Sequence, residues 1–269
     1  MPSRQQPITL LRFVPYLAAA MVLICFYGYV RSQREAERAF SLYENGQLVD
    51  AQQALRSALL FSPGATWQGQ QLTMVAARLE QAIEALERRV EVPLPPNASD
   101  PERLVRARNL AMLNRRAEAR AILDDSATLA DTADAHQLRG VMDETQGAFA
   151  PAAMWYAQAQ AAWQAQEESA PQQAGLTAAR KGQALCARKL GRLAEAEQHY
   201  QAVLRHSPTA AAHFLVAQFY EDAQQVQRSQ YHALQAMQLD PERYAEPGQR
   251  LIDKLMTSHF GCWSIASSP

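Results

Sequence analysis

Histidine spacing is the first place where this chain could carry chemistry. His199, His206 and His213 recur every seven residues, and two helical turns would bring such side chains to one face. A row of imidazoles could bind a transition metal or transfer protons. However, Ser207 and Pro208 separate the last two histidines, and proline ends a helix, so one helix cannot present all three. The series therefore predicts neither a catalytic site nor a metal site.

Two other groups of reactive residues lead to the same conclusion. His259 and Cys262 are spaced as metal ligands can be, but a structural zinc site needs four ligands and no second pair accompanies them. The adjacent carboxylates Asp124-Asp125 and Glu167-Glu168 fall at predicted helix ends or loops, where solvated charge is expected. We therefore predict no metal, no cofactor and no enzymatic activity.

A pair of basic residues points to binding instead. Lys181 and Arg188 lie seven residues apart in a predicted helix, so both should project from one face and could hold a carboxylate between them. This pair can bind a ligand only if the fold leaves this face of the helix at the surface.

Composition indicates that the elements of this fold are helices. The chain is 48% hydrophobic and 20% charged with a net charge of -1, so it can bury a large core and has no bulk attraction for nucleic acids. Only 11 glycines occur, while alanine and glutamine are abundant, which favours an all-α fold. The three cysteines, at positions 25, 186 and 262, encode no disulfide framework.

Two segments of the chain are similar to each other. Residues 45–63 read NGQLVDAQQALRSALLFSP, and residues 191–208 read GRLAEAEQHYQAVLRHSP. Both combine a turn glycine, an alanine five residues later, a large apolar residue four positions further on, and a closing Ser-Pro. This arrangement resembles the second helix of a tetratricopeptide repeat, which is a pair of antiparallel helices.

The resemblance extends along the chain through small residues, which let paired helices approach closely. On the first helices these fall at Ala39, Ala107, Gly140, Ala184 and Ala217. On the second helices they fall at Ala51, Ala119, Ala152, Ala196 and Ser229, with a larger companion at Leu55, Leu123, Tyr156, Tyr200 and Ala233. The first-helix intervals are 68, 33, 44 and 33 residues, consistent with a repeat of about 34 residues, one skipped unit and one insertion.

We therefore predict a tetratricopeptide-like α-solenoid of about five helix pairs, with one long helix and a C-terminal capping helix. The long amphipathic helix should occupy the skipped unit, at residues 67–91. The insertion after Tyr156 should extend the second helix and its loop, with Trp163 buried against the next repeat. The expected segments are a tail (1–12), an anchor (13–30), a first unit with the long helix (32–92), a proline-rich connection (93–100), a four-unit block (101–241), the capping helix (242–260) and a tail (261–269).

The predicted anchor is a single transmembrane helix at Phe13–Val30, which contains no charged residue and is long enough to cross a bilayer. A cleaved signal peptide is the alternative, but the run exceeds a usual signal core and lacks a small-x-small cleavage pair. Flanking arginines on the two sides are nearly balanced. We expect a bacterial inner-membrane protein with a cytoplasmic N-terminal tail and a periplasmic C-terminal domain.

The resemblance implies a concave surface, formed by the first helices, that binds an extended peptide or a partner helix. Its predicted residues are Leu104, Arg108, Met112, Gln137, Val141, Glu144, Lys181, Leu185, Arg188, Phe214, Gln218 and Glu221. The predicted function is a membrane-anchored scaffold that binds a protein partner during assembly or maintenance of an envelope complex. The alternatives are a permanent structural subunit of a larger membrane complex and, less favoured, an enzyme with an unrecognised site.

Overall fold

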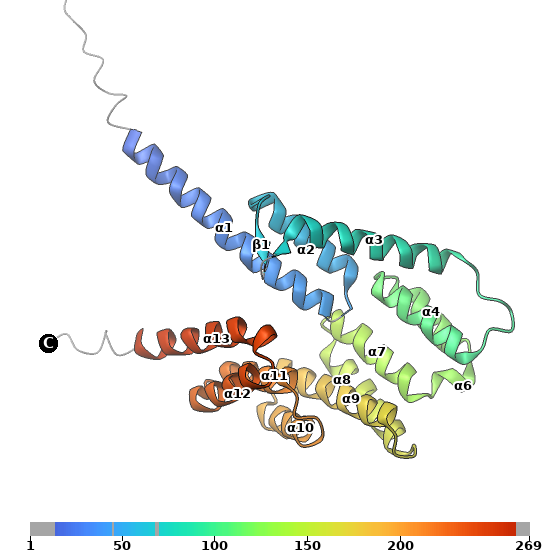
Figure 1. Ribbon diagram of the computed structural model, residues 1–269. Helices are drawn as coiled ribbons and strands as arrows, with labels where there is room; N and C mark the ends of the chain where they lie inside the picture. Colours follow the sequence, from blue (N-terminus) through green and yellow to red (C-terminus); the bar gives the residue numbers. More distant parts are fainter. Residues whose placement is uncertain (1–13, 45, 68–69, 262–269) are drawn as a thin grey trace, which may run out of the picture. The chain divides into compact units, whose positions relative to one another are not determined.

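Turns with left-handed backbone connect the paired helices. A computed structural model of the chain describes residues 14–44, 46–67 and 70–261 (Figure 1). Within them, the residues with positive φ are Gly46 (73°), Asn114 (64°), Gly147 (76°), Gly191 (75°) and Gln224 (57°). At each turn this residue and the next donate N–H groups back to the preceding helix, which ends it with a left-handed cap. The turns are 68, 33, 44 and 33 residues apart, the same intervals that the small residues predict.

The chain divides into two compact units, residues 1–122 (unit 1) and 123–269 (unit 2). In unit 1, α1 packs along α2, α2 contacts α3, and α3 contacts α4. Its elements are α1 (Val14–Glu44), α2 (Leu48–Phe61), the short antiparallel strands β1 (Thr66–Trp67) and β2 (Gln70–Gln71), α3 (Leu72–Glu91), α4 (Asp100–Met112) and most of α5 (Arg116–Asp124).

The start of the long helix differs from the prediction. We expected a helix over residues 67–91, but α3 begins at Leu72, and residues 66–71 belong to the two-stranded hairpin. The amide of Leu72 donates to the carbonyl of Ala65 at 3.0 Å, so the chain folds back before the helix begins. The apolar stripe of α3 does face inward, since Leu72, Leu79, Ile83 and Val90 are buried.

Residues 1–13 and the side chains of residues 14–25, which include most of the predicted anchor, lie outside the described part of the chain. Among the described residues, no helix has both the length and the apolar content needed to cross a bilayer.

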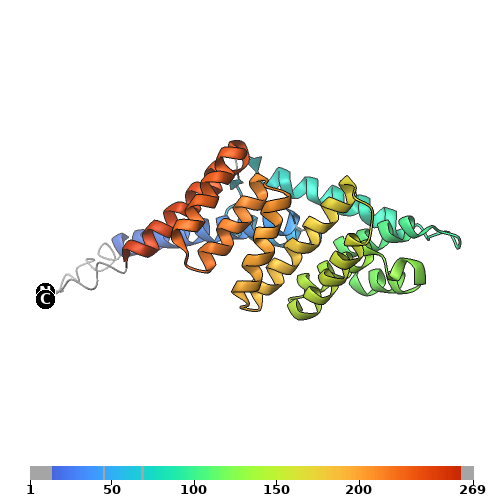
Figure 2. The ribbon, with the colours of Figure 1, turned by 90° about the horizontal axis from the view of Figure 1, so that it is seen from below.

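Unit 2 consists of helices that follow one another in chain order. Each helix from α7 to α13 contacts the next, and Figure 2 shows α8 to α13 side by side as yellow to red ribbons. These elements are α6 (Ala127–Ala130), α7 (Ala133–Thr145), α8 (Phe149–Gln164), α9 (Ala170–Lys189), α10 (Leu193–His206), α11 (Ala210–Asp222), α12 (Val226–Leu239) and α13 (Pro241–Gly261).

The insertion lies mainly in a different helix from the one predicted. We expected it to extend α8, which has 16 residues, but α9 has 20 residues where α7 and α11 have 13. The hydroxyl of Ser169 caps α9, and Pro171 stands in its first turn, where proline costs no hydrogen bond. The added turns therefore extend a first helix at its N-terminus.

The predicted packing positions form the core. All ten small residues and all five companions of the predicted repeat are buried. The predicted capping helix is also confirmed: Leu251 and Leu255 of α13 pack with Ala217 and Ala233 of the last helix pair. The described residues are therefore helical apart from the short hairpin and the connecting turns and loops.

Candidate functional site

The twelve predicted binding residues fall in both units. Leu104, Arg108 and Met112 lie on α4 of unit 1. The other nine lie on α7, α9 and α11 of unit 2, and together they are called the first-helix surface below. None of the twelve is fully buried, although the packing positions on the same helices are. Side chains at these positions are thus left accessible by the packing of the helices.

On α7, two of the three residues hold aromatic side chains of the neighbouring helix. The hydroxyl of Tyr156 donates to a carboxylate oxygen of Glu144 at 2.6 Å, and the indole Nε1 of Trp163 donates to Oε1 of Gln137 at 3.3 Å. Burial raises the pKa of Glu144 above its ordinary value. Val141 packs on the cluster around Tyr156. Glu144 and Gln137 therefore accept hydrogen bonds from core aromatic residues of α8, which is a structural role.

On α9, the two basic residues have different roles. Nε of Arg188 lies 3.6 Å from the carboxylate of Asp222 on α11 and forms an ion pair with it, although Nε and Nη1 of this guanidinium are buried without a hydrogen bond. Lys181 makes no hydrogen bond or ion pair within the described residues, and partial burial lowers the pKa of its ammonium group. The predicted two-residue carboxylate clamp is thus reduced to one available cation, Lys181.

On α11, two of the three predicted binding residues contact the capping helix α13. The ring of Phe214 lies 5.2 Å from that of Tyr244, and Glu221 is paired with Lys254. Gln218 stays half-exposed between them.

The aromatic residues of α8 fit against glycines of both neighbouring first helices. The ring of Tyr156 lies between Gly140 on α7 and Gly182 on α9, and a Cβ atom at Gly140 would lie 2.9 Å from it. A Cβ atom at Gly182 would overlap the same ring, and one at Gly175 would overlap Trp163. Trp163 is buried, as predicted. These contacts fix the spacing of α7 and α9.

Comparisons with known proteins identify this fold. No protein-family model matches the chain, and a search of curated proteins finds no match. Among solved structures, the hetero-tetramer Cut9-Hcn1 of the APC/C matches with a TM-score of 0.53 at 13% identity, over 84% of this chain and 42% of that chain. The chain has the tetratricopeptide-repeat fold.

Two further structures are similar over the same share of this chain. The type IV pilus biogenesis factor PilW is 18% identical with a TM-score of 0.49, and 98% of that chain is covered. A tetratricopeptide repeat protein from Parabacteroides merdae is 15% identical with a TM-score of 0.34, and 99% of that chain is covered. Our chain spans less than half the length of the Cut9-Hcn1 chain that it matches.

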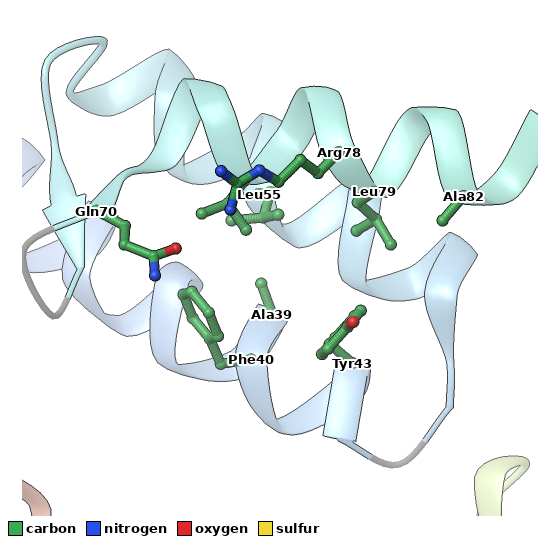
Figure 3. Close-up of a pocket in the computed structure, with 9 residues that line it drawn as sticks. Ala39, Phe40, Tyr43, Leu55, Gln70, Arg78, Leu79 and Ala82 are labelled. Carbon is green, nitrogen blue, oxygen red and sulfur yellow. The ribbon is translucent and has the colours of Figure 1, made fainter. Parts of the chain in front are cut away.

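A cavity in the first repeat was not predicted from the sequence (Figure 3). It has a volume of about 210 Å³ and lies between α1, α2 and α3. Phe40 and Tyr43 of α1 line one side, Leu79 and Ala82 of α3 line the other, and Leu55 of α2 lies between them. The cavity is called the first-repeat pocket below.

Two polar side chains complete this pocket. Gln70 of β2 and Arg78 of α3 are both exposed, and Figure 3 shows Arg78 extending toward the Gln70 end of the pocket. The only signal of the pocket in the sequence is Leu55, which stands at the repeat position that carries tyrosine in two later repeats. That signal is weak, because leucine also occupies the position at Leu123, where it is fully buried.

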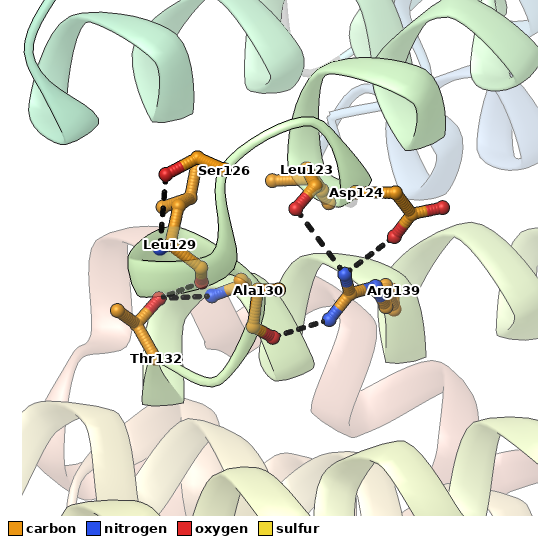
Figure 4. A network of polar contacts seen from close by, with 8 residues as sticks. Leu123, Asp124, Ser126, Leu129, Ala130, Thr132 and Arg139 are labelled. Atoms are coloured by element: carbon orange, nitrogen blue, oxygen red, sulfur yellow. Dashed lines mark hydrogen bonds and ion pairs between the residues drawn. The ribbon is translucent and has the colours of Figure 1, made fainter.

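A buried arginine joins the first elements of unit 2 (Figure 4). Arg139 of α7 donates to the carbonyl oxygens of Ala130 at 2.6 Å and Leu123 at 3.4 Å, and it pairs with Asp124 at 2.6 Å. These groups lie at the ends of α5 and α6, where helix carbonyls lack intrahelical partners. Its guanidinium also lies 5.1 Å from the ring of Trp155. We assign Arg139 a structural role.

The histidines form a pair that the sequence analysis missed. Nδ1 of His213 lies 3.0 Å from Nδ1 of His232 on α12, and Tyr220 stacks on His232 at 5.6 Å. Burial lowers the pKa of His232 to about 4, and the charges of His213 and Arg228 act in the same direction. Within the described residues, no group of three or more histidine, cysteine or acidic side chains could hold a metal ion. His259 and Cys262 cannot be compared, since the side chain of His259 and all of Cys262 lie outside the described part.

Proposed function

We propose that this chain is a protein-binding scaffold whose partner docks on the first-helix surface of unit 2. The observation that carries the proposal is Lys181, a half-buried cation without a partner among the described residues, on a surface that helix packing leaves accessible. The tetratricopeptide-repeat fold supports it, because stacked helix pairs offer extended concave surfaces for binding.

The chemistry of this surface defines the ligand. Val141 and Leu185 are half-buried apolar side chains on α7 and α9, and Phe214 of α11 is half-buried where it packs on the capping helix. A partially desolvated ammonium group gains most from a carboxylate, because a charge-assisted hydrogen bond replaces the water that it lacks. The partner is therefore an extended peptide or a helix that carries apolar side chains and an acidic group.

Site-specific crosslinking tests the docking surface. A photoreactive amino acid at Leu185 should capture the partner, while one at Gln198, which is exposed on the second helix α10, should not. Lys181→Glu should reduce capture at least fivefold, and Lys189→Glu, an exposed lysine at the end of the same helix, provides the matched control. Capture only from α10, or equal capture by Lys181→Glu and Lys189→Glu, would contradict the proposal.

We also propose that residues 13–30 anchor the chain in a bacterial inner membrane, with the repeats in the periplasm, and that the scaffold serves assembly or maintenance of an envelope complex. The absence of charged residues in this run supports the anchor. So does the exposure of Phe26, Tyr27 and Tyr29, because aromatic residues are enriched at membrane interfaces.

Fractionation tests the anchor and its orientation. The wild-type chain should stay in membranes after alkaline carbonate extraction, and Ile24→Arg should release it, because a charged side chain is costly in the bilayer. Protease added to spheroplasts should digest the repeats. Extraction of the wild-type chain by carbonate would refute the anchor. Protection of its repeats from protease in spheroplasts would refute the proposed orientation.

A further inference from the structure

The first-repeat pocket corresponds to a position that is filled in unit 2. Leu55 and Tyr156 each lie sixteen residues after the small residue of their own first helix, Ala39 or Gly140. In unit 2 the ring of Tyr156 fills the space between neighbouring first helices. In unit 1 the shorter Leu55 leaves the pocket between α1 and α3. The repeat architecture therefore already contains, in Tyr156, an example of the side chain that such a space accepts.

The volume and lining of the pocket agree with an aromatic occupant. The cavity measures about 210 Å³, and an engineered apolar cavity of about 150 Å³ is large enough to bind benzene. Apart from Gln70 and Arg78, its lining is formed by apolar and aromatic residues. One inserted aromatic side chain would thus be surrounded by apolar atoms.

Charge restricts the partner further. Arg78 forms no ion pair or hydrogen bond within the described residues, whereas Arg88 of the same helix is paired with Glu84, and Arg56 of α2 is paired with Glu80. An aromatic ring entering the pocket would cover part of the Arg78 guanidinium and remove water from it. The guanidinium can also stack on the ring, and a carboxylate next to the inserted residue would add a charge-assisted hydrogen bond to Arg78.

We propose that the first-repeat pocket docks an aromatic side chain of a partner protein from a segment in which acidic residues flank the aromatic residue. The aromatic ring occupies the space beside Leu55, and a flanking carboxylate pairs with Arg78. This site lies in unit 1 and is independent of the first-helix surface, so the chain holds its partners at two places.

Peptide binding to the methyl-labelled full chain tests the proposal. The probes are acetyl-Glu-Trp-Glu-amide, acetyl-Lys-Trp-Lys-amide and acetyl-Glu-Ala-Glu-amide, and the readout is the NMR shift of the Val75 and Leu79 methyl groups. We expect the Glu-Trp-Glu peptide to bind at least fivefold more tightly than either of the others. Arg78→Glu should reverse the preference between the two tryptophan peptides, while Arg88→Glu should leave it unchanged.

A second experiment fills the first-repeat pocket with a larger side chain. Leu55→Phe should weaken binding of the Glu-Trp-Glu peptide at least tenfold, and Ala82→Leu fills the same space from α3 if that variant misfolds. Absence of methyl shifts with every peptide, an unchanged preference in Arg78→Glu, or unchanged binding in both filled variants would each overturn the proposal. Lys181→Glu should bind these peptides like the wild type, so failure here is distinguishable from failure of the first-helix surface.

Discussion

Leu55 in unit 1 and Tyr156 in unit 2 occupy the same repeat position with opposite results. The tyrosine ring reaches both neighbouring first helices, which carry glycine to receive it, and its hydroxyl is satisfied by Glu144. Leu55 lines a cavity between α1 and α3, and Arg78 at its edge has no ion pair among the described residues. One position of this repeat can therefore either fill the core, as Tyr156 does, or border a cavity, as Leu55 does.

The same contrast holds for the arginines of the two units. Arg139 is buried, and its guanidinium donates hydrogen bonds to two carbonyls and pairs with a carboxylate of its own unit. Arg78 is exposed and has no such partner among the described residues. Arg139 is therefore part of the internal polar contacts of unit 2, whereas the guanidinium of Arg78 is accessible to a ligand.

The largest expected effect comes from removing the aromatic ring that unit 2 depends on. Tyr156→Ala should lower the free energy of unfolding by about 4 kcal/mol, because it leaves a cavity between two helices. Urea denaturation followed by tryptophan fluorescence measures this loss. Tyr231→Ala, at an exposed tyrosine of α12, is the control and should stay within about 0.5 kcal/mol of the wild type. Equal losses in the two variants would show that the ring of Tyr156 does not hold the helices of unit 2 together.

Arg139→Met should have the next largest effect. The variant keeps most of the apolar stem but leaves the carbonyls of Leu123 and Ala130 without their donor, which should cost about 2 kcal/mol. Thermal unfolding compared with Arg205→Met, an exposed arginine of α10, measures it. If Arg139→Met unfolds at the temperature of that control, Arg139 does not hold the start of unit 2 together.

The contribution of histidine to acid sensitivity should fall in unit 2, because all six histidines of the chain lie at positions beyond 122. An unfolded histidine takes up a proton near pH 6.5, while the pKa of His232 in the folded protein is lowered to about 4. The folded state therefore binds fewer protons between these values, and stability that is present above pH 6.5 is lost as the pH falls toward 4.

His232→Phe keeps the stacked ring and removes this titration. It should recover roughly 1 kcal/mol of the loss at pH 4.5, a value reduced for the half-exposed ring. His206→Phe, at an exposed position, should recover none. Urea denaturation at pH 7.5 and pH 4.5 measures the difference, and identical pH profiles for wild type and His232→Phe would refute the role of the pair.

The smallest expected effect is a gain in stability, whereas the effects above are losses. Leu55→Phe should raise the stability of the chain by about 0.5 to 1 kcal/mol, because the larger side chain fills the pocket. Thermal unfolding measures this gain. A clear loss of stability would show that the space beside Leu55 cannot accept a ring, which would also weaken the analogy with Tyr156.

Much of the fold could be predicted because helix pairing depends on local, repeated features. Small residues such as Ala184, large companions such as Tyr200 and turn glycines such as Gly191 follow a fixed spacing, and their burial follows from that spacing. The hairpin before Leu72 could not be predicted, since four strand residues carry no periodic signal. The position of the insertion was also wrong, because the length of an interval does not say which helix receives it.

The candidate sites were less predictable, because they depend on which side chains already have partners. Sequence spacing placed Lys181 and Arg188 on one helix, but it could not reveal that Asp222 of another helix neutralises Arg188. The pairing of His213 with His232 likewise joins two helices. Arg78 was not singled out at all, because sequence spacing does not show that it lacks an ion pair among the described residues.

The uninterrupted helix α1 has one more consequence. It runs without a break from Val14 to Glu44, and its last turns form the first repeat. Each added residue advances a helix by about 100°, so a single insertion between Val30 and Arg34 would swing the N-terminal half of α1 about a quarter turn relative to that repeat. The helical phase of α1 therefore sets which way its N-terminal half faces relative to the first repeat.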